Sequence, residues 1–236
     1  MKEDARWTAD NNVDLKKLTL AVVVRILFVI IILGLMFFLP AGTTHYWQAW
    51  LYLAVLIIPM LCLVVFLLIR DPEVLERRMK MKEKEAEQKK IMKLSYIYFF
   101  MAFLIPGFDR RYGWSSVPLV IVMISDFFVL LGYLLFVLVL MKNRYASRII
   151  QVEPGQKVVT TGPYAVVRHP MYLAVLLIYL FSPLALGSYW AMTTTGLLIL
   201  ILIVRIQNEE KVLNTELNGY SEYTHKTKYR LIPGIW

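Results

Sequence analysis

The polar residues with the clearest chemical potential lie in the last third of this 236-residue chain. A Gly-Pro-Tyr-x-x-x-Arg-His-Pro-x-Tyr run begins at Gly162. Pro170 in this run suits the first turn of a helix, because its missing N–H costs nothing there. The free N–H groups of a helix start favour an anion, and Arg168 and His169 stand directly before this one. These residues predict a polar ligand site at the start of a helix.

A second polar group follows one predicted helical hairpin later, in the run Arg-Ile-Gln-Asn-Glu-Glu. Arg205 and Glu209 are spaced i, i+4, so they lie on one face of a helix, where the last apolar run ends. Taken singly, such features also fit a surface ion pair worth under about 1 kcal/mol, contacts with lipid phosphates, or interfacial aromatic residues. Their occurrence together at one membrane face favours a site.

Long apolar segments must hold these residues in place. The chain is 58% hydrophobic with a mean hydropathy of +0.58, which is more apolar than soluble domains usually are. Runs of about 18 or more apolar residues predict transmembrane helices. We therefore predict an all-α integral membrane protein with about six membrane-embedded helices. The predicted apolar segments are 18–39, 47–69, 94–107, 117–141, 171–186 and 189–204.

The net charge of +9 comes from basic residues that flank these segments. They gather before residue 18, in 70–93, in 142–168 and after 204, whereas the loop 40–46 contains no Lys or Arg. The positive-inside rule then places both termini and the polar residues on the cytosolic side. Anionic lipid headgroups account for the basic charge, so membrane lipids are expected partners and nucleic acid is not. Segment 70–93 is interpreted as a solvated helix or arm.

Two charged residues interrupt the apolar segments. Arg25 lies about two turns from the polar start of its segment and is interpreted as reaching the cytosolic interface. Asp126 could pair with another helix or face a cavity, but it lies near the end opposite the polar motifs, which disfavours a catalytic role. No metal site is predicted, because Cys62 is the single cysteine and the three histidines lack ligand spacing.

The motifs together resemble the isoprenylcysteine carboxyl methyltransferase family, within a wider group of membrane phospholipid methyltransferases. The resemblance rests on the Gly162 run, on Arg-x-x-x-Glu-Glu, and on a Tyr-x-x-Tyr tail with a late Arg and Pro. It covers roughly residues 141–236, which are expected to form the catalytic region with its helical hairpin. Residues 1–140 match only as apolar helices, with the charged segment 70–93 between them. Ala174 departs from the glycine that is common in the family.

The resemblance implies that S-adenosylmethionine is the cofactor. It implies Arg205 and Glu209 as catalytic residues, with Arg205 meeting the substrate carboxylate and Glu209 also binding the cofactor. A lipid-like or prenylated methyl acceptor would enter from the bilayer, and its carboxylate would be methylated. The cofactor-binding residues implied by matching position are Gln151, Gln156, Lys157, Val158, Val159, Tyr164, His169, Pro170, Met171, Tyr172 and Glu209.

Three other functions fit the same sequence features. A phospholipid amine N-methyltransferase would share the cofactor site, an NADPH-dependent sterol-type reductase could share the C-terminal architecture, and a scaffold or transporter would have no catalytic site. A Gly-x-Gly-x-x-Gly loop is absent, so a soluble nucleotide-binding methyltransferase fold is not supported. The expected location is a bacterial or archaeal cytoplasmic membrane, or the endoplasmic reticulum of a eukaryote, with the site facing the cytosol. The sequence makes no prediction of oligomeric state.

Overall fold

The computed structural model describes residues 14–79, 86–143, 145, 152–153 and 155–236. Over these residues the chain folds into helices and their connections, without a strand. The all-α class predicted from the sequence is therefore confirmed. The helices are α1 (Leu15–Ala41), α2 (Trp47–Arg70), α3 (Pro72–Met79), α4 (Ala86–Tyr112), α5 (Leu119–Lys142), α6 (Pro170–Ala185), α7 (Thr195–Glu216) and α8 (Tyr220–Lys226), with the 3-10 turns η1 (Gly162–Ala165) and η2 (Trp190–Thr194).

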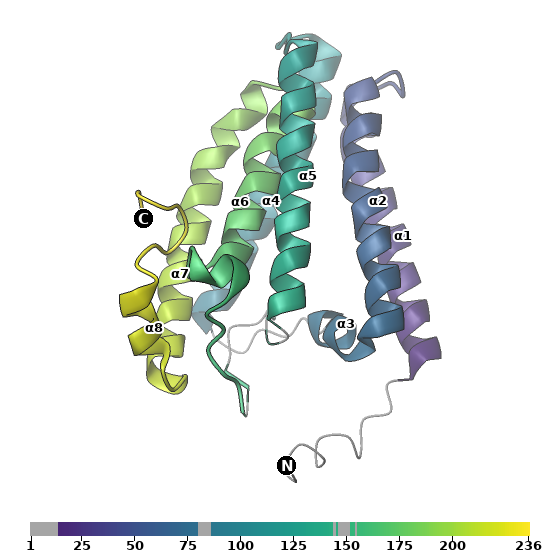
Figure 1. Ribbon diagram of the computed structural model, residues 1–236. Helices are drawn as coiled ribbons and strands as arrows, with labels where there is room; N and C mark the ends of the chain where they lie inside the picture. The colour runs from purple at the N-terminus through teal and green to yellow at the C-terminus, as the bar shows by residue number, and fades with distance from the viewer. Residues whose placement is uncertain (1–13, 80–85, 144, 146–151, 154) are drawn as a thin grey trace.

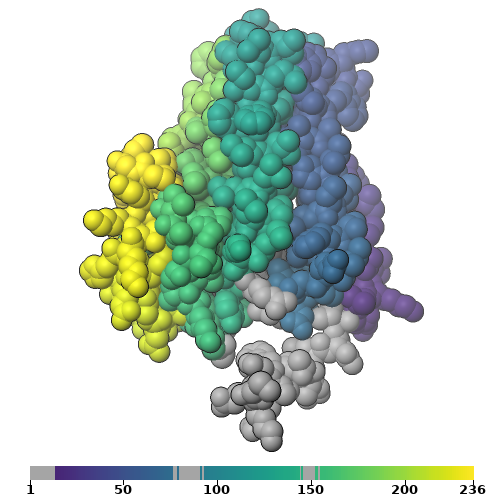
Figure 2. Space-filling model, viewed as in Figure 1, coloured from purple at the N-terminus to yellow at the C-terminus, as the bar shows by residue number. Residues whose placement is uncertain are grey.

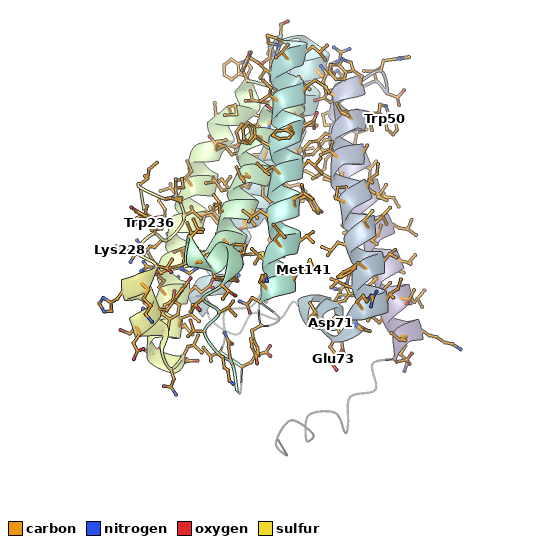
Figure 3. The ribbon with its side chains drawn as sticks, viewed as in Figure 1. Trp50, Asp71, Glu73, Met141, Lys228 and Trp236 are labelled. Carbon is orange, nitrogen blue, oxygen red and sulfur yellow. The ribbon has the colours of Figure 1, made fainter. Side chains whose placement is uncertain are left out.

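The long helices run side by side and form a bundle with two distinct ends (Figure 1). One end carries the starts of α1 and α6, the ends of α2, α5 and α7, and the short helices α3 and α8; we call it the site end. The other carries the connections α1–α2, α4–α5 and α6–η2, and we call it the turn end. Figure 3 locates Trp50 near the turn end and Asp71, Glu73 and Met141 near the site end.

Four helices of the described residues are long and apolar enough to cross a membrane. They are α1, α2, α5 and the continuous segment Trp190–Glu216, which contains η2 and α7. Helix α6 is apolar but shorter, and α4 begins in charged sequence. The structure thus supports an integral membrane protein, while the full number of six embedded helices stays a prediction.

Most of the described residues of the charged segment 70–93 belong to two separate helices rather than to one arm. Pro72–Met79 fold as α3, and Ala86 begins α4, which continues to Tyr112. The predicted short segment 94–107 is therefore only the middle of a longer helix. The predicted segment began too late, because the Glu, Gln and Lys residues that precede residue 94 are polar but are good helix formers.

Helix α3 is fastened to the first hairpin by Arg25. The Arg25 Nη1 donates a hydrogen bond of 2.8 Å to the carbonyl oxygen of Met79, at the last residue of α3. Val74 and Leu75 bury their side chains in a cluster with Leu18 of α1. Arg25 thus extends to the site end, where it satisfies a helix-terminal carbonyl that has no partner within its own helix.

Two glycines allow helices to pack at unusually short distance. A Cβ placed on Gly107 of α4 would lie 2.8 Å from the carbonyl oxygen of Phe37 and 2.9 Å from Pro40 Cβ, both on α1. A Cβ on Gly132 of α5 would lie 2.8 Å from Ile178 Cγ1 and 3.0 Å from the Ala174 oxygen, both on α6. Small residues at helix interfaces permit such close packing in membranes.

A buried carboxylate organises the turn end. Asp109 accepts hydrogen bonds of 2.7 Å from both the backbone N–H and the hydroxyl of Ser115, and another from the hydroxyl of Ser188. The neighbouring Arg110 Nη2 donates to the carbonyl oxygen of His45 at 3.1 Å. These bonds join the end of α4 to the other two connections, and the basic side chain of Arg110 is used in a contact within the protein.

We predict that Gly107→Ala lowers the free energy of unfolding by about 1–3 kcal/mol, because the added methyl group meets a backbone carbonyl and a proline ring that cannot move aside. The matched control is Gly34→Ala in α1, where a Cβ meets no atom within 4 Å. That control should be neutral or stabilising by up to about 1 kcal/mol, from helix propensity alone. Thermal unfolding in detergent measures both, and equal effects would contradict the packing argument.

Candidate functional site

A cavity of about 950 Å³ extends from the site end into the bundle. Its polar end is formed by four parts of the chain: the loop before α6, the first turn of α6, the second half of α7, and helix α8. The family resemblance implied a set of cofactor-binding residues, and every one of them that the structure describes lines this cavity. Gln151 lies outside the described residues. These lining residues are Gln156, Lys157, Val158, Val159, Tyr164, His169, Pro170, Met171, Tyr172 and Glu209, together with Arg205.

The inner part of the cavity is apolar and lies between the membrane-spanning helices. Ile32 of α1, Tyr52 and Leu56 of α2, Phe99 of α4 and Phe136 of α5 contribute to its walls. Helices α1, α2 and α4, which the family resemblance covered only as apolar segments, therefore contribute to the cavity walls. The cavity joins a charged end to a long hydrocarbon-lined interior.

Arg205 and Glu209 share one face of α7, as their spacing predicted, and Tyr172 of α6 connects them. The Arg205 Nε donates a 2.9 Å hydrogen bond to the Tyr172 oxygen. The Tyr172 hydroxyl donates in turn to Oε2 of Glu209 at 2.6 Å. Oε1 of Glu209 lies 3.9 Å from Nδ1 of His169. The polar end thus presents a guanidinium and a carboxylate in fixed relation.

Glu210, the next residue on α7, serves a different purpose. Its carboxylate is buried and is surrounded by three basic side chains. Oε1 lies 2.9 Å from Nε of Arg168 and 3.3 Å from Nε2 of His169, and Oε2 accepts a 2.7 Å bond from Nε of Arg230. A buried carboxylate is expensive unless such partners compensate it. Glu210 therefore ties together α7, the residues before α6 and the C-terminal tail.

The C-terminal tail lies along the residues that precede α6. The backbone N–H of Arg168 donates to the Tyr229 oxygen and that of His169 to the Arg230 oxygen, both at 2.9 Å. The Arg230 guanidinium lies 5.4 Å from the centre of the Trp236 ring. Figure 2 shows this tail packed on the segment that leads into α6. The start of α6, with His169 as its N-cap residue and Pro170 in its first turn, is thus held from outside the helix, and the predicted helix start is confirmed.

Tyrosines of α8 complete the polar end. The Tyr223 hydroxyl donates to the carbonyl oxygen of Tyr164 at 2.7 Å, and Nδ2 of Asn143 donates to the Tyr164 hydroxyl at 2.9 Å. Tyr220 also lines the cavity, and its hydroxyl is buried without a hydrogen-bond partner among the described residues. Burial and the nearby glutamates raise the pKa of Tyr220, so it stays a protonated donor. A buried unsatisfied donor beside a cavity is a ready contact for a ligand.

Sequence reasoning did not assign Asn143, Glu210, Tyr220, Tyr223 or Arg230 to the site. The motif that included Glu209 also contains Glu210, and the tail tyrosines and arginine were part of the resemblance. The signal was therefore in the sequence, but the contacts that separate these roles join residues far apart in the chain.

Asp126 lies outside this site. It is buried in α5, its two carboxylate oxygens have no hydrogen-bond partner in the described part of the chain, and it does not line the cavity. It remains a buried acid near the turn end, at a distance from the polar residues. Nor do His, Cys, Asp and Glu form any group of three suited to a metal ion within the described residues.

Comparison with known families gives one match. The model of the isoprenylcysteine carboxyl methyltransferase family matches residues 121–215, so the resemblance suspected from the sequence is confirmed over this region. The match begins inside α5 and includes α6 and nearly all of α7, but ends before the tail tyrosines. No curated protein matches the chain.

We predict that Glu210→Ala destabilises the protein by about 3–5 kcal/mol, because removal of one partner leaves the buried Arg168 guanidinium without its anion. Thermal unfolding measures the loss, and protease cleavage after Lys226 or Lys228 should quicken as the tail detaches. Glu216→Ala, an exposed position further along α7, is the matched control and should change stability by less than about 0.5 kcal/mol. A mild effect of Glu210→Ala would show that the carboxylate does not hold the tail.

Proposed function

We propose that this chain, whose residues 121–215 belong to the isoprenylcysteine carboxyl methyltransferase family, methylates the carboxylate of an isoprenylcysteine-like lipid with S-adenosylmethionine. The observation that carries the proposal is the continuity of one cavity from Arg205 and Glu209 to an apolar interior between the spanning helices. A prenylated cysteine has both of the matching parts, a terminal carboxylate and a long hydrocarbon chain. Burial of that chain contributes about 0.8 kcal/mol for each CH₂ group.

The residues at the polar end suit S-adenosylmethionine. Glu209 offers a carboxylate to a cationic ligand, and Lys157 offers a cation to the carboxylate of the methionine part. Val158, Val159 and Met171 offer apolar surface to an aromatic base. The unsatisfied hydroxyl of Tyr220 offers a further donor. Bound there, the cofactor supplies an electrophilic methyl group on a positively charged sulfur.

The protein's own contribution is positioning and charge. A carboxylate is already ionised at neutral pH, so the acceptor needs no general base. Arg205 orients this carboxylate through the planar donors of its guanidinium. The apolar walls exclude water, which strengthens these charge interactions and keeps the oxygen atom aimed at the methyl group. Methyl transfer from the bound cofactor to this ionised oxygen would require no proton transfer, so the residues of the polar end would act by orientation and charge alone.

The predicted orientation places the site end in the cytosol. Lys142, Arg168 and Arg230 all lie at this end, which agrees with the positive-inside rule. A cofactor dissolved in the cytosol then reaches the polar end directly, while the lipid acceptor enters the apolar part from the bilayer. The expected division of the chain follows, with 1–140 supplying the lipid-facing walls and 141–236 supplying the charged residues.

Methyl transfer by the purified protein tests the proposal. S-adenosylmethionine with a radioactive methyl group is supplied with N-acetyl-S-farnesylcysteine or with phosphatidylethanolamine vesicles. We expect a base-labile methyl ester on the first acceptor and no label on the second. Labelled phospholipid would instead support amine methylation. Binding of NADPH but not of S-adenosylhomocysteine, measured by isothermal titration, would support the reductase, and binding of neither would support a scaffold.

Arg205→Lys should lower the rate of this reaction by about thirty-fold to a thousand-fold. Lysine keeps the charge but loses the two-donor fork, and a bidentate charge-assisted contact contributes about 2–4 kcal/mol in the transition state. Cofactor affinity should stay nearly constant, because the contact is with the acceptor. Full activity would reject the orienting role, and lost binding of S-adenosylhomocysteine would assign Arg205 to the cofactor instead.

A further inference from the structure

We propose that Tyr172 is a positioning residue that links the acceptor subsite to the cofactor subsite through its hydroxyl group. The inference rests on the proposed function and changes the role of Tyr172, which the family resemblance implied only as a cofactor contact. It starts from the two hydrogen bonds that this oxygen makes, with Arg205 at 2.9 Å and with Glu209 at 2.6 Å.

The direction of both bonds follows from the chemistry of the three groups. The Nε–H of an arginine can only donate, since the guanidinium stays protonated in proteins. The Tyr172 oxygen must therefore accept from Arg205. Its single proton is then available for Glu209, whose ionised carboxylate can only accept. The two hydrogen bonds therefore run in one direction only, from Arg205 to Tyr172 and from Tyr172 to Glu209. Each bond involves a charged group, which makes it stronger than a bond between neutral groups.

Tyr172 is well placed to act as a fixed reference point for its two partners. It lies in the first turn of α6, where its backbone N–H donates to the His169 oxygen at 3.0 Å. His169 is held in turn by its bond to the Arg230 oxygen and by Glu210. A tyrosine side chain has few rotatable bonds, whereas Arg205 and Glu209 lose considerable rotamer freedom when ordered. The rigid residue therefore sets the geometry of the flexible ones.

The bond to Nε determines how Arg205 can meet an acceptor. The Nε–H of the planar guanidinium is engaged by the Tyr172 oxygen, which restricts the orientation of the whole group. An acceptor carboxylate then meets Arg205 through its Nη groups rather than side-on through Nε. The proton donated to Oε2 of Glu209 likewise restricts the orientation of this carboxylate, whose Oε1 lies on the side of His169. One hydroxyl thus orients the group that aligns the acceptor and the group that faces the cofactor.

Removal of this oxygen should disturb the two subsites together. In Tyr172→Phe the ring remains, but the hydrogen bonds from Arg205 and to Glu209 are both lost. Each side chain can then adopt orientations that its bond to the Tyr172 oxygen excludes. The guanidinium and the carboxylate therefore lose their alignment together.

The experiment compares kcat/KM for N-acetyl-S-farnesylcysteine in wild type, Tyr172→Phe, Arg205→Lys and the double variant. We expect Tyr172→Phe to lower kcat/KM at least tenfold in the wild-type background, with a higher KM for the acceptor. In the Arg205→Lys background the same change should cost less than about threefold, because the group that Tyr172 orients is already altered. Affinity for S-adenosylhomocysteine should fall in Tyr172→Phe and in Glu209→Gln by similar factors.

The matched control is Tyr46→Phe. Tyr46 is also a buried tyrosine with a bonded hydroxyl, which donates to the Leu186 oxygen at the turn end, away from the cavity. The Tyr46→Phe variant should have a lower melting temperature but an unchanged kcat/KM and an unchanged cofactor affinity. This separates a loss of stability from a loss of alignment.

Each outcome decides between the two proposals. Strictly additive effects of Tyr172→Phe and Arg205→Lys would overturn the linking role and leave a separate structural or cofactor contact. If the wild type transfers the methyl group and the Tyr172→Phe variant does so at the same rate, the inference is overturned but the proposed function stands. Absence of methyl transfer in the wild type would overturn the proposed function, and the inference with it.

Discussion

The buried carboxylate of Glu210 is the interaction on which the geometry of the site depends. It brings Arg168, His169 and Arg230 to one point, and these residues come from the loop before α6, from the N-cap of α6 and from the tail. Without an anion there, the guanidinium groups of Arg168 and Arg230 would lie at the helix start without a compensating charge. Because the tail and the loop are joined through this point, the first turn of α6 has a defined position relative to α7.

The position of α6 relative to α7 then determines what faces the cavity. Tyr172 lies in the first turn of α6 and contacts Arg205 and Glu209 only if the two helices keep this register. Gly132 of α5 also permits a close approach of α5 to α6. The polar end is therefore a product of helix packing as much as of its charged residues.

The two ends of the bundle are stabilised by different polar networks. At the turn end, Asp109 joins the connections and leaves the helices anchored there. At the site end, Glu210 joins the tail and the loop, while Arg25 secures α3. Between the two networks the cavity walls are largely apolar, so the charged groups of the polar end lie next to an apolar interior. The proposed lipid acceptor and charged cofactor would need such a boundary between two environments.

The sequence alone determined the features that depend on neighbours in the chain. Apolar runs predict helices, Pro170 predicts a helix start, and the i, i+4 spacing puts Arg205 and Glu209 on one face, because each follows from local geometry. Only the tertiary structure showed that Glu209 faces the cavity while Glu210 pairs with Arg168 and Arg230. Successive residues on a helix point about 100° apart. Which of the two faces the cavity, and which meets Arg230, therefore depends on how α7 is rotated against α6 and the tail. That rotation is set by contacts between residues distant in sequence, and for the same reason neither the Tyr172 hydrogen bonds nor the lining of the cavity by α1 and α2 could be predicted.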